Sequence, residues 1–175
     1  MEIRDLTVTD SKAYLDLLLK LDNETKFMML EPGERDTSLD VMEKRLLNND
    51  DTMSVYMGAF IDDELVGFIS LWRGSAKRAR HSAYIVMGIT SSYTGRGIGK
   101  LLLGAGETWA KKNCVCRLEM TVMTHNINAI NLYERFGFSK EGTKKKSLLV
   151  DGCYVDEYYM SKILGLCPEM VKSTE

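Results

Sequence analysis

Apolar residues at helical spacing predict four amphipathic helices in this chain. Two lie in the first 50 residues, one after the cap residues at positions 9–11 and one from about Leu39 to Leu47. Two more lie in the second half, at about Ile98–Lys112 and Asn128–Phe136. Between the first two, the polar stretch Asn23–Asp36 contains a Pro-Gly pair that breaks any helix.

Short runs of apolar and β-branched residues predict strands around these helices. The dipeptides Asp62-Asp63 and Asp151-Gly152 predict tight turns between neighbouring strands. The strand candidates are Glu2–Leu6, Met53–Ile61, Leu65–Trp72, His81–Ile89, Cys116–Val122, a strand that begins at Phe138–Lys140, and Leu148–Tyr158 with its turn. This order predicts a mixed α/β fold with a largely antiparallel sheet and one parallel strand–helix–strand unit with a right-handed crossover.

The stretch Tyr93–Leu103, Y-T-G-R-G-I-G-K-L-L-L, links the predicted central strand to the third helix. Its three alternating glycines and two cations are Gly95, Gly97, Gly99, Arg96 and Lys100. Glycine costs conformational entropy, so three in alternation indicate backbone that turns tightly or approaches a ligand closely. Unpaired N–H groups at a helix N-terminus bind anions. A phosphate-bearing ligand is therefore the first hypothesis.

Two familiar phosphate loops do not fit this stretch. A Walker A loop needs glycine where Thr94 stands and serine or threonine where Leu101 stands, and the dinucleotide fingerprint finds Lys100 or Leu102 at its third glycine. A flexible glycine loop without a ligand is the plain alternative. The interleaved cations, the preceding apolar strand and the amphipathic helix that follows favour the phosphate interpretation.

The chain resembles the GCN5-related N-acetyltransferases in two places. The loop x-x-G-x-G-I-G after a strand is similar to that family's acetyl-CoA pyrophosphate motif, and N-I-N-A-I-N-L-Y-E-R-F-G-F (Asn126–Phe138) is similar to its second signature helix. The resemblance extends from Glu2 to about Leu164. It implies one N-acetyltransferase domain over residues 1–175, with six to seven strands, about four helices and a splayed central strand pair.

The same resemblance implies acetyl-CoA as the cofactor. The loop amides would hold the pyrophosphate, and Thr94 stands where the family usually has Arg or Gln, which removes one side-chain phosphate contact. The end of the central strand would offer backbone groups to the pantetheine arm, and one amide there can also serve a developing oxyanion. The implied cofactor-binding residues are Met87, Gly88, Ile89, Thr94, Gly95, Arg96, Gly97, Ile98, Gly99, Lys100, Asn126 and Asn131. Asn126 is equally suited to cap the helix that follows, and Asn128 is a second cap candidate.

The resemblance further implies that Tyr133 protonates the departing thiolate. A thiol titrates near about 8.5 and a phenol near about 10, so this transfer is slightly uphill in water but feasible at hydrogen-bond distance. An aromatic packing role is the alternative for Tyr133. No general base is identified, because the predicted central strand carries no carboxylate. Glu119 on the next strand and Glu31 or Glu34 are candidates, but such residues are more often solvated or substrate-contacting groups than bases. A free amine also has a neutral fraction without help.

Substrate contacts are expected in the early loop (Asp22–Asp36), the region where the resembled family builds its acceptor site. This loop mixes carboxylates with Phe and Met, which suits an amine with an apolar or polycationic body, and solvated carboxylates are an equal alternative. The candidate substrate residues are Glu24, Phe27, Glu31, Glu34 and Glu119. A small-molecule amine (a polyamine, amino acid derivative or aminoglycoside) is the first choice. A protein N-terminal amine is the alternative, because Asp151–Met160 also resembles ribosomal-protein acetyltransferases.

Composition and charge reduce the number of protein classes that remain possible. At 175 residues with 45% hydrophobic residues, the chain can bury the core of one domain. Its formal net charge of −2 gives no general attraction to nucleic acid or to an anionic membrane. No stretch is apolar enough to span a bilayer and the N-terminus lacks a signal-peptide core, so a cytoplasmic location is expected.

A metal site is not expected. Cys114 and Cys116 with His125 nearby have zinc-like spacing, but the chain has only two histidines and no second cysteine pair with ligand spacing. We therefore expect structural thiols. Homodimerisation is neither required nor excluded by the sequence. Two further classes stay open, a non-catalytic acyl-CoA-binding module and a nucleotide-binding protein.

Overall fold

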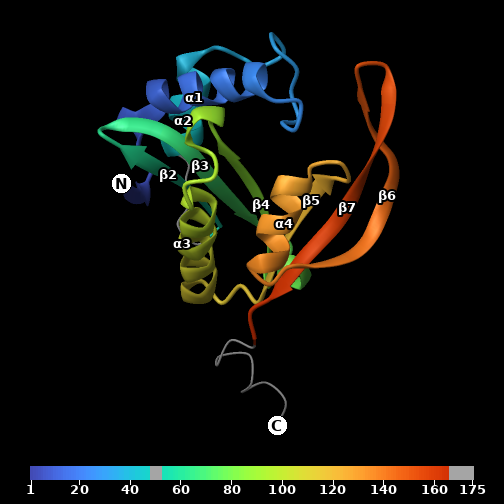
Figure 1. Ribbon diagram of the computed structural model, residues 1–175. Coiled ribbons are helices and arrows are strands. Elements are labelled where there is room, and N and C mark those ends of the chain that lie inside the picture. Colours follow the sequence, from blue (N-terminus) through green and yellow to red (C-terminus); the bar gives the residue numbers. More distant parts are fainter. Residues whose placement is uncertain (48–52, 166–175) are drawn as a thin grey trace. The chain divides into compact units, whose positions relative to one another are not determined.

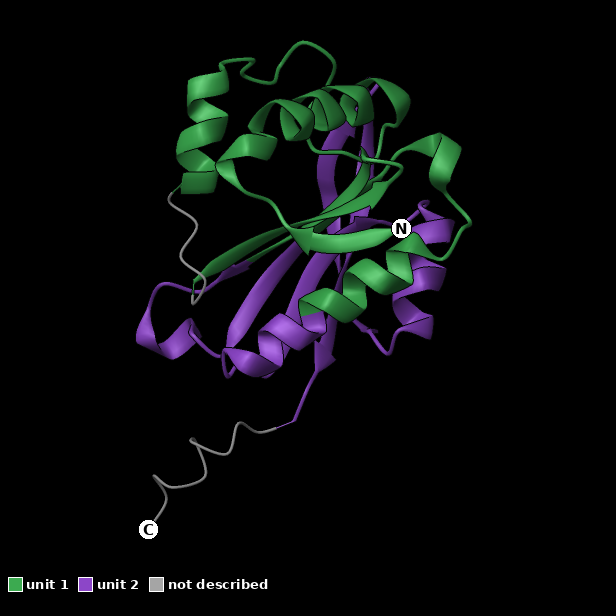
Figure 2. Cartoon of the chain, turned by 90° about the vertical axis from the view of Figure 1, so that its left-hand side faces the viewer, with its two compact units in different colours: residues 1–71, 86–106 green, residues 72–85, 107–175 purple. Residues whose placement is uncertain are grey.

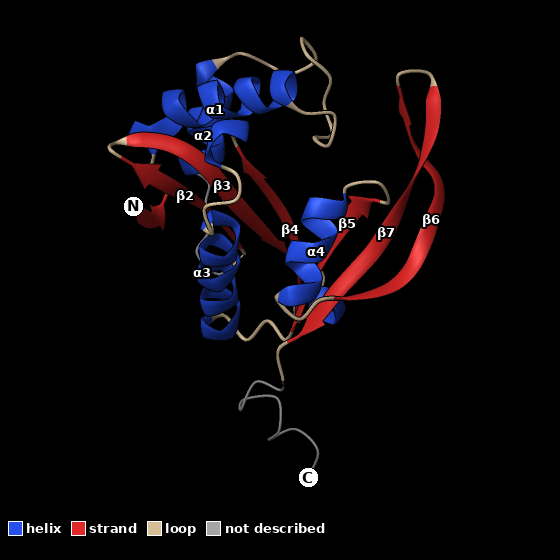
Figure 3. Cartoon of the chain, in the orientation of Figure 1, coloured by secondary structure: helices blue, strands red, loops and turns tan. Residues whose placement is uncertain are grey.

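The computed structural model describes residues 1–47 and 53–165. Figures 1 and 3 show a sheet with helices packed against it. The helices are α1 (Ser11–Glu24), α2 (Leu39–Leu47), α3 (Ile98–Lys112) and α4 (Ile127–Arg135). The strands are β1 (Glu2–Asp5), β2 (Ser54–Ile61), β3 (Glu64–Arg73), β4 (Ser82–Ile89), β5 (Arg117–Met123), β6 (Ser139–Val150) and β7 (Cys153–Ile163). The sheet order β1-β2-β3-β4-β5-β7-β6 confirms the predicted mixed α/β fold.

The predicted elements agree with the observed ones to within about two residues at most ends. Both predicted turns are present, because Asp62, Asp63, Asp151 and Gly152 all have φ between 49° and 75°. The prediction that Asn48–Asp51 ends the second helix lies outside the described residues.

Figure 2 divides the chain into two compact units, and the first comprises Met1–Leu71 and Val86–Gly106. In it, β1 pairs antiparallel with β2, and the amphipathic face of α1 is buried. The core cluster contains Leu6, Tyr14, Leu15, Leu17, Leu18, Leu21, Met42, Leu46, Tyr56, Leu65 and Phe68. Burial of so many large side chains fixes the end of α1, where the early loop begins.

The second unit comprises Trp72–Ile85 and the chain from Glu107 onward. In it, β7 pairs antiparallel with both β5 and β6. The parallel ladder between β4 and β5 covers only residues 82–84 and 117–119. This short ladder agrees with the expected separation of the central strand pair. Gly137, with φ +94°, ends α4 in the left-handed conformation that its position predicts.

No helix in the described ranges is long and apolar enough to cross a membrane.

Candidate functional site

The glycine loop, which joins β4 to α3, owes its shape to two residues in the left-handed conformation. Gly95 has φ +75° and Gly97 has φ +82°, a region that residues with a Cβ rarely adopt. A Cβ added at either position would meet nothing within 4 Å. Glycine is therefore required at both positions by backbone conformation, and the space beside each is left open.

The loop leads directly into α3. The first amide bonds of this helix run from Lys100 N and Leu101 N to Gly97 O, at 3.1 and 3.3 Å. The amides that precede them, including those of Ile98 and Gly99, lie in the first turn, where N–H groups have no intrahelical acceptor. These N–H groups and the positive end of the helix dipole suit a bound phosphate.

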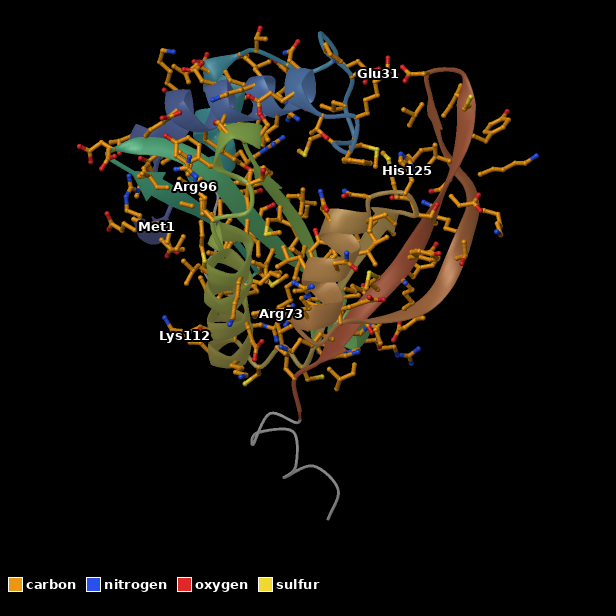
Figure 4. All side chains as sticks on the ribbon, viewed as in Figure 1. Met1, Glu31, Arg73, Arg96, Lys112 and His125 are labelled. Carbon is orange, nitrogen blue, oxygen red and sulfur yellow. The ribbon has the colours of Figure 1, made fainter. Side chains whose placement is uncertain are left out.

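Side chains of the loop bond mostly to the loop itself. The Arg96 guanidinium, labelled in Figure 4, lies 4.8 Å above the Tyr93 ring, and its Nη2 donates to Ser92 O at 3.1 Å. The Thr94 hydroxyl donates to Ser91 O at 2.8 Å. Thr94 thus stabilises the turn before the glycines, whereas Lys100 is exposed.

Contacts with distant segments of the first unit anchor the start of the loop. Thr90 is buried, and its amide donates to Val66 O at 3.0 Å. The Ser91 amide donates to the Glu24 carboxylate at 2.8 Å, and the Tyr93 hydroxyl donates to Glu64 at 2.9 Å. Ser91 and Glu64 could not be identified from the sequence, and neither could the partner of Tyr93, because only the fold brings these residues together.

The end of β4 is crowded at one residue. A Cβ at Gly88 would lie 2.7 Å from Leu21 Cδ1 and 3.0 Å from Phe68 Cε1, so a larger residue would have to displace these buried side chains. Met87 and Ile89 on either side are half-buried. The close approach of α1 and β3 explains Gly88 by packing, and the predicted pantetheine contacts of this segment remain a prediction.

Tyr133 lies in the second unit with its ring buried at 8% exposure. The ring packs on Phe138 with centroids 5.9 Å apart. In the described part of the chain, no fully buried side-chain polar atom lacks a partner, and nothing hydrogen-bonds the Tyr133 hydroxyl. The hydroxyl is therefore not completely enclosed, and it keeps a free position for a hydrogen bond to a ligand.

The environment of Tyr133 keeps its phenol protonated. Burial, with a smaller contribution from the nearby Tyr84 phenol, raises the pKa of Tyr133 to about 12. This group is consequently a hydrogen-bond donor throughout the neutral and moderately alkaline range.

Asn126 and not Asn128 caps α4, which corrects one of the two cap candidates. The Asn126 side chain accepts a bond from Ala129 N at 3.3 Å, and its carbonyl accepts from Ile130 N at 3.0 Å. Asn128 lies inside the helix, and Asn131 is exposed one turn further on.

The carboxylates of the early loop are used partly for folding. Glu34 accepts the Glu31 amide at 2.8 Å and its own amide donates to Glu31 O at 3.1 Å, which closes a turn. Asp22 is buried and pairs with Arg35, which holds the loop against the end of α1. Glu31, labelled in Figure 4, is exposed in this loop, and Phe27 is 43% exposed. Glu24 bonds to the glycine loop as described above.

Glu119, the remaining substrate candidate, lies on β5 of the second unit. Its Oε2 accepts from Arg117 Nε at 2.7 Å, and 38% of its side chain is exposed. Glu119 pairs in register with Tyr84 of β4, which the sequence analysis did not identify. Strand alternation predicts which face a residue occupies but not its neighbour on the next strand.

Within residues 1–47 and 53–165, His, Cys, Asp and Glu form no group of three that could hold a metal ion. Cys116 and Cys153 are free thiols, whereas Cys114 is disulfide-bonded, so the expectation of a thiol is wrong at that position. His125 lies in the turn between β5 and α4 (Figure 4). Cys167 lies outside the described residues.

Comparison with known sequences gives one family. The family model described as Acetyltransferase (GNAT) family matches residues 15–138. The L-amino acid N-acetyltransferase AaaT of Escherichia coli (strain K12) is 34% identical over 109 residues. That alignment covers 60% of this chain and 65% of AaaT, a little under two thirds of the relative.

Comparison with solved structures covers nearly the whole chain. An acetyltransferase of the GNAT family from Streptococcus pneumoniae has a TM-score of 0.89 and 28% identity, over 94% of this chain and 99% of that one. A ribosomal-protein-alanine N-acetyltransferase from Brucella melitensis has a TM-score of 0.83 and 25% identity, over 94% and 100%. The two structures agree with the fold described above.

Proposed function

This chain belongs to the acetyltransferase (GNAT) family, and from that premise we propose that it transfers the acetyl group of acetyl-CoA to a primary amine. The observation that carries the proposal is the glycine loop. Its two left-handed glycines and the first turn of α3 present backbone N–H groups beside open space. A diphosphate is the ligand for which such a loop is suited.

Acetyl-CoA would supply an activated thioester when bound. The residues proposed to hold its pyrophosphate are those from Thr94 to Lys100, with Arg96 leaving its contact with Ser92 to reach the phosphates. Thr94 contributes through the turn that it closes and not through direct charge. For the pantetheine arm, we propose the backbone of Met87–Ile89 in the first unit and the side chains of Asn126 and Asn131 in the second.

Tyr133 is proposed as the proton donor to the leaving thiolate. Its pKa of about 12 lies more than three units above that of a thiol, so full transfer in the resting protein is more uphill than the sequence alone suggested. The positive charge that the amine gains on attack favours the phenolate and reduces this gap. Until then the phenol stabilises negative charge on sulfur as a hydrogen-bond donor.

The chemistry balances without a protein base. The amine nitrogen forms the new bond to the carbonyl carbon, the carbon–sulfur bond breaks, and the amine loses one proton to solvent while the sulfur gains one from Tyr133. The phenol then regains its proton from solvent. An amine with a neutral fraction at the working pH needs no carboxylate to begin this sequence.

We propose a small molecule as the acceptor, with a protein N-terminal amine as the second candidate. The first is supported by the similarity to an L-amino acid N-acetyltransferase, and the second by the similarity to a ribosomal-protein-alanine N-acetyltransferase. The exposed Glu31 and Phe27 suit a cationic amine with an apolar body. The single domain and the cytoplasmic location stay predictions. A homodimer is neither required nor excluded.

The test is thiol release from acetyl-CoA, measured against a panel of polyamines, amino acids, aminoglycosides and peptides. Release with an amine and none without it supports the proposal. Coenzyme A binding in calorimetry with no release against the whole panel would point to a non-catalytic acyl-CoA-binding module. A rise in thermal stability with ATP but not with coenzyme A would point to a nucleotide-binding protein.

A further inference from the structure

A cavity of about 280 Å³ lies on the sheet of the second unit, among β4, β5, β6 and β7. Its polar walls come from Tyr84, Arg117, Glu119, Glu141 and Tyr159, and two methionines complete it. All these residues belong to one compact unit. The volume is near the lower limit of small-molecule sites, about 300 Å³, so a short amine or a single side chain fits inside it.

Within the described residues, one carboxylate oxygen in this cavity has no hydrogen-bond partner. Arg117 donates to both oxygens of Glu141 and, through Nε, to Glu119 Oε2 at 2.7 Å. Ser161 Oγ also donates to Glu141, at 2.6 Å. One guanidinium therefore balances two carboxylates, which leaves the cluster with one negative charge. Across the described ranges, Glu119 Oε1 accepts no hydrogen bond.

The hydroxyl groups of the two tyrosines in the cavity differ in how firmly they are held. The Tyr84 hydroxyl is fixed by Thr121, with 2.8 Å to Thr121 Oγ1 and 3.2 Å to Thr121 N. Tyr159 is 47% exposed, and within the described residues its hydroxyl makes no hydrogen bond. A negative cluster bordered by phenol rings attracts an ammonium group through charge and through the ring quadrupole. An anion would meet an Arg117 that is already paired twice.

We propose that this cavity holds a second ammonium group of the acceptor, so that the substrate is a diamine or polyamine. The inference rests on the proposed function and names the substrate class for it. Glu119 Oε1 accepts the hydrogen bond of that ammonium, and Tyr159 borders it. Neither residue takes part in the acetyl transfer itself.

The position of the cavity within the second unit supports this assignment. Tyr84 and Glu119 are the last paired residues of the β4–β5 ladder, so the cavity lies where that ladder ends. Tyr84 is also close enough to Tyr133 to contribute to its raised pKa. A cation held beside Tyr84 is therefore near the phenol that is proposed to donate the proton.

The test compares diamines with monoamines of equal chain length in the thiol-release assay. A charge-assisted hydrogen bond at Glu119 predicts a kcat/KM for the best diamine that exceeds that of its monoamine by on the order of 10- to 100-fold. Glu119→Gln should reduce this ratio to within about threefold and leave the KM for acetyl-CoA unchanged. Asp16→Asn removes an exposed, ion-paired carboxylate on α1 and serves as the matched control with an unchanged ratio.

The inference would be overturned by wild-type protein that does not prefer diamines, or by a preference that survives in Glu119→Gln. Preference for a lysine-containing peptide over every diamine would overturn it in favour of a protein acceptor. If Glu119→Gln does not fold, Tyr159→Leu provides the second variant, with an expected loss of about threefold in the ratio. If no amine releases thiol, the proposed function fails. Calorimetric titration of the diamine alone into wild type and Glu119→Gln then decides on the cavity.

Discussion

The glycine loop of the first unit and the Tyr133 region of the second are built from different parts of the chain. The loop depends on main-chain geometry, with left-handed Gly95 and Gly97 ahead of a helix start. The second unit presents single side-chain groups, namely the phenol of Tyr133 and the carboxylate of Glu119. Backbone sites tolerate many side-chain changes, which would allow the proposed phosphate site to keep its function with Thr94 in place of a cationic or amide residue. Side-chain sites can be abolished by the loss of one atom.

Removal of the Tyr133 hydroxyl should have the largest effect. Tyr133→Phe keeps the ring that packs on Phe138 and removes the proton donor, so we expect kcat to fall on the order of 100-fold. The KM for acetyl-CoA should stay within about twofold, because the glycine loop is untouched. Steady-state kinetics measure both values, and an unchanged kcat would exclude Tyr133 from the reaction.

A change of backbone conformation in the loop should act on affinity instead. Gly97→Ala places a Cβ on a residue with φ +82°, which costs about 1–2 kcal/mol. We expect coenzyme A to bind about tenfold more weakly in calorimetry, with kcat at saturation changed far less. Gly104→Ala in α3 is the matched control, since its Cβ meets nothing within 4 Å and its backbone is helical. That control should stabilise the fold by up to about 1 kcal/mol. Equal losses of affinity in the two variants would contradict a conformational role for Gly97.

The anchor of the loop should have a smaller effect. Glu24→Gln weakens the charge-assisted bond to the Ser91 amide while keeping an acceptor in place. We expect the KM for acetyl-CoA to rise about threefold, with an unchanged kcat for a saturating amine. If Glu24 instead contacts the amine, the KM for the amine rises and that for acetyl-CoA does not, and the two assignments separate in one experiment.

The ion pair beneath the proposed ammonium site should give the smallest effect, visible only in acid. Arg117, with help from Ser161, lowers the pKa of Glu141 to about 2 from an ordinary value of 4.5. A carboxyl group whose pKa is lowered by folding stabilises the fold above its unfolded pKa, and this contribution is lost as the pH falls toward the folded pKa. The melting temperature should therefore fall more steeply between about pH 5 and pH 2.5 in wild type than in Glu141→Gln. Parallel curves would show that this pair adds nothing to stability.

Much of the fold could be predicted because local sequence signals mark the ends of each helix and strand. α3 runs over the predicted residues, from the glycine loop at Ile98 to the lysines at its end. α4 begins one residue early because the sequence offers two good caps, Asn126 and Asn128, and local propensity does not choose between them. The hairpin at Asp151-Gly152 follows directly from its turn residues.

The candidate site was predictable only where it is local in sequence. The glycine loop carries its own conformational requirement, so its residues could be identified without a structure. The bond between Glu24 and Ser91 joins residues 67 apart, and the Tyr84–Thr121 bond joins residues 37 apart. Periodicity assigns each of these side chains to a face but cannot give the register that pairs them. Glu24 was accordingly expected to contact substrate and is found bonded to the loop.

The Glu24–Ser91 bond has a mechanical consequence for the first unit. Glu24 is the last residue of α1, so the chain that carries Glu31 and Glu34 starts from a point tethered to the glycine loop over 2.8 Å. A shift of Ser91 when a diphosphate settles on the loop would pull on Thr25 and on the turn beyond it. The position of the early loop would thereby depend on whether the glycine loop holds a ligand.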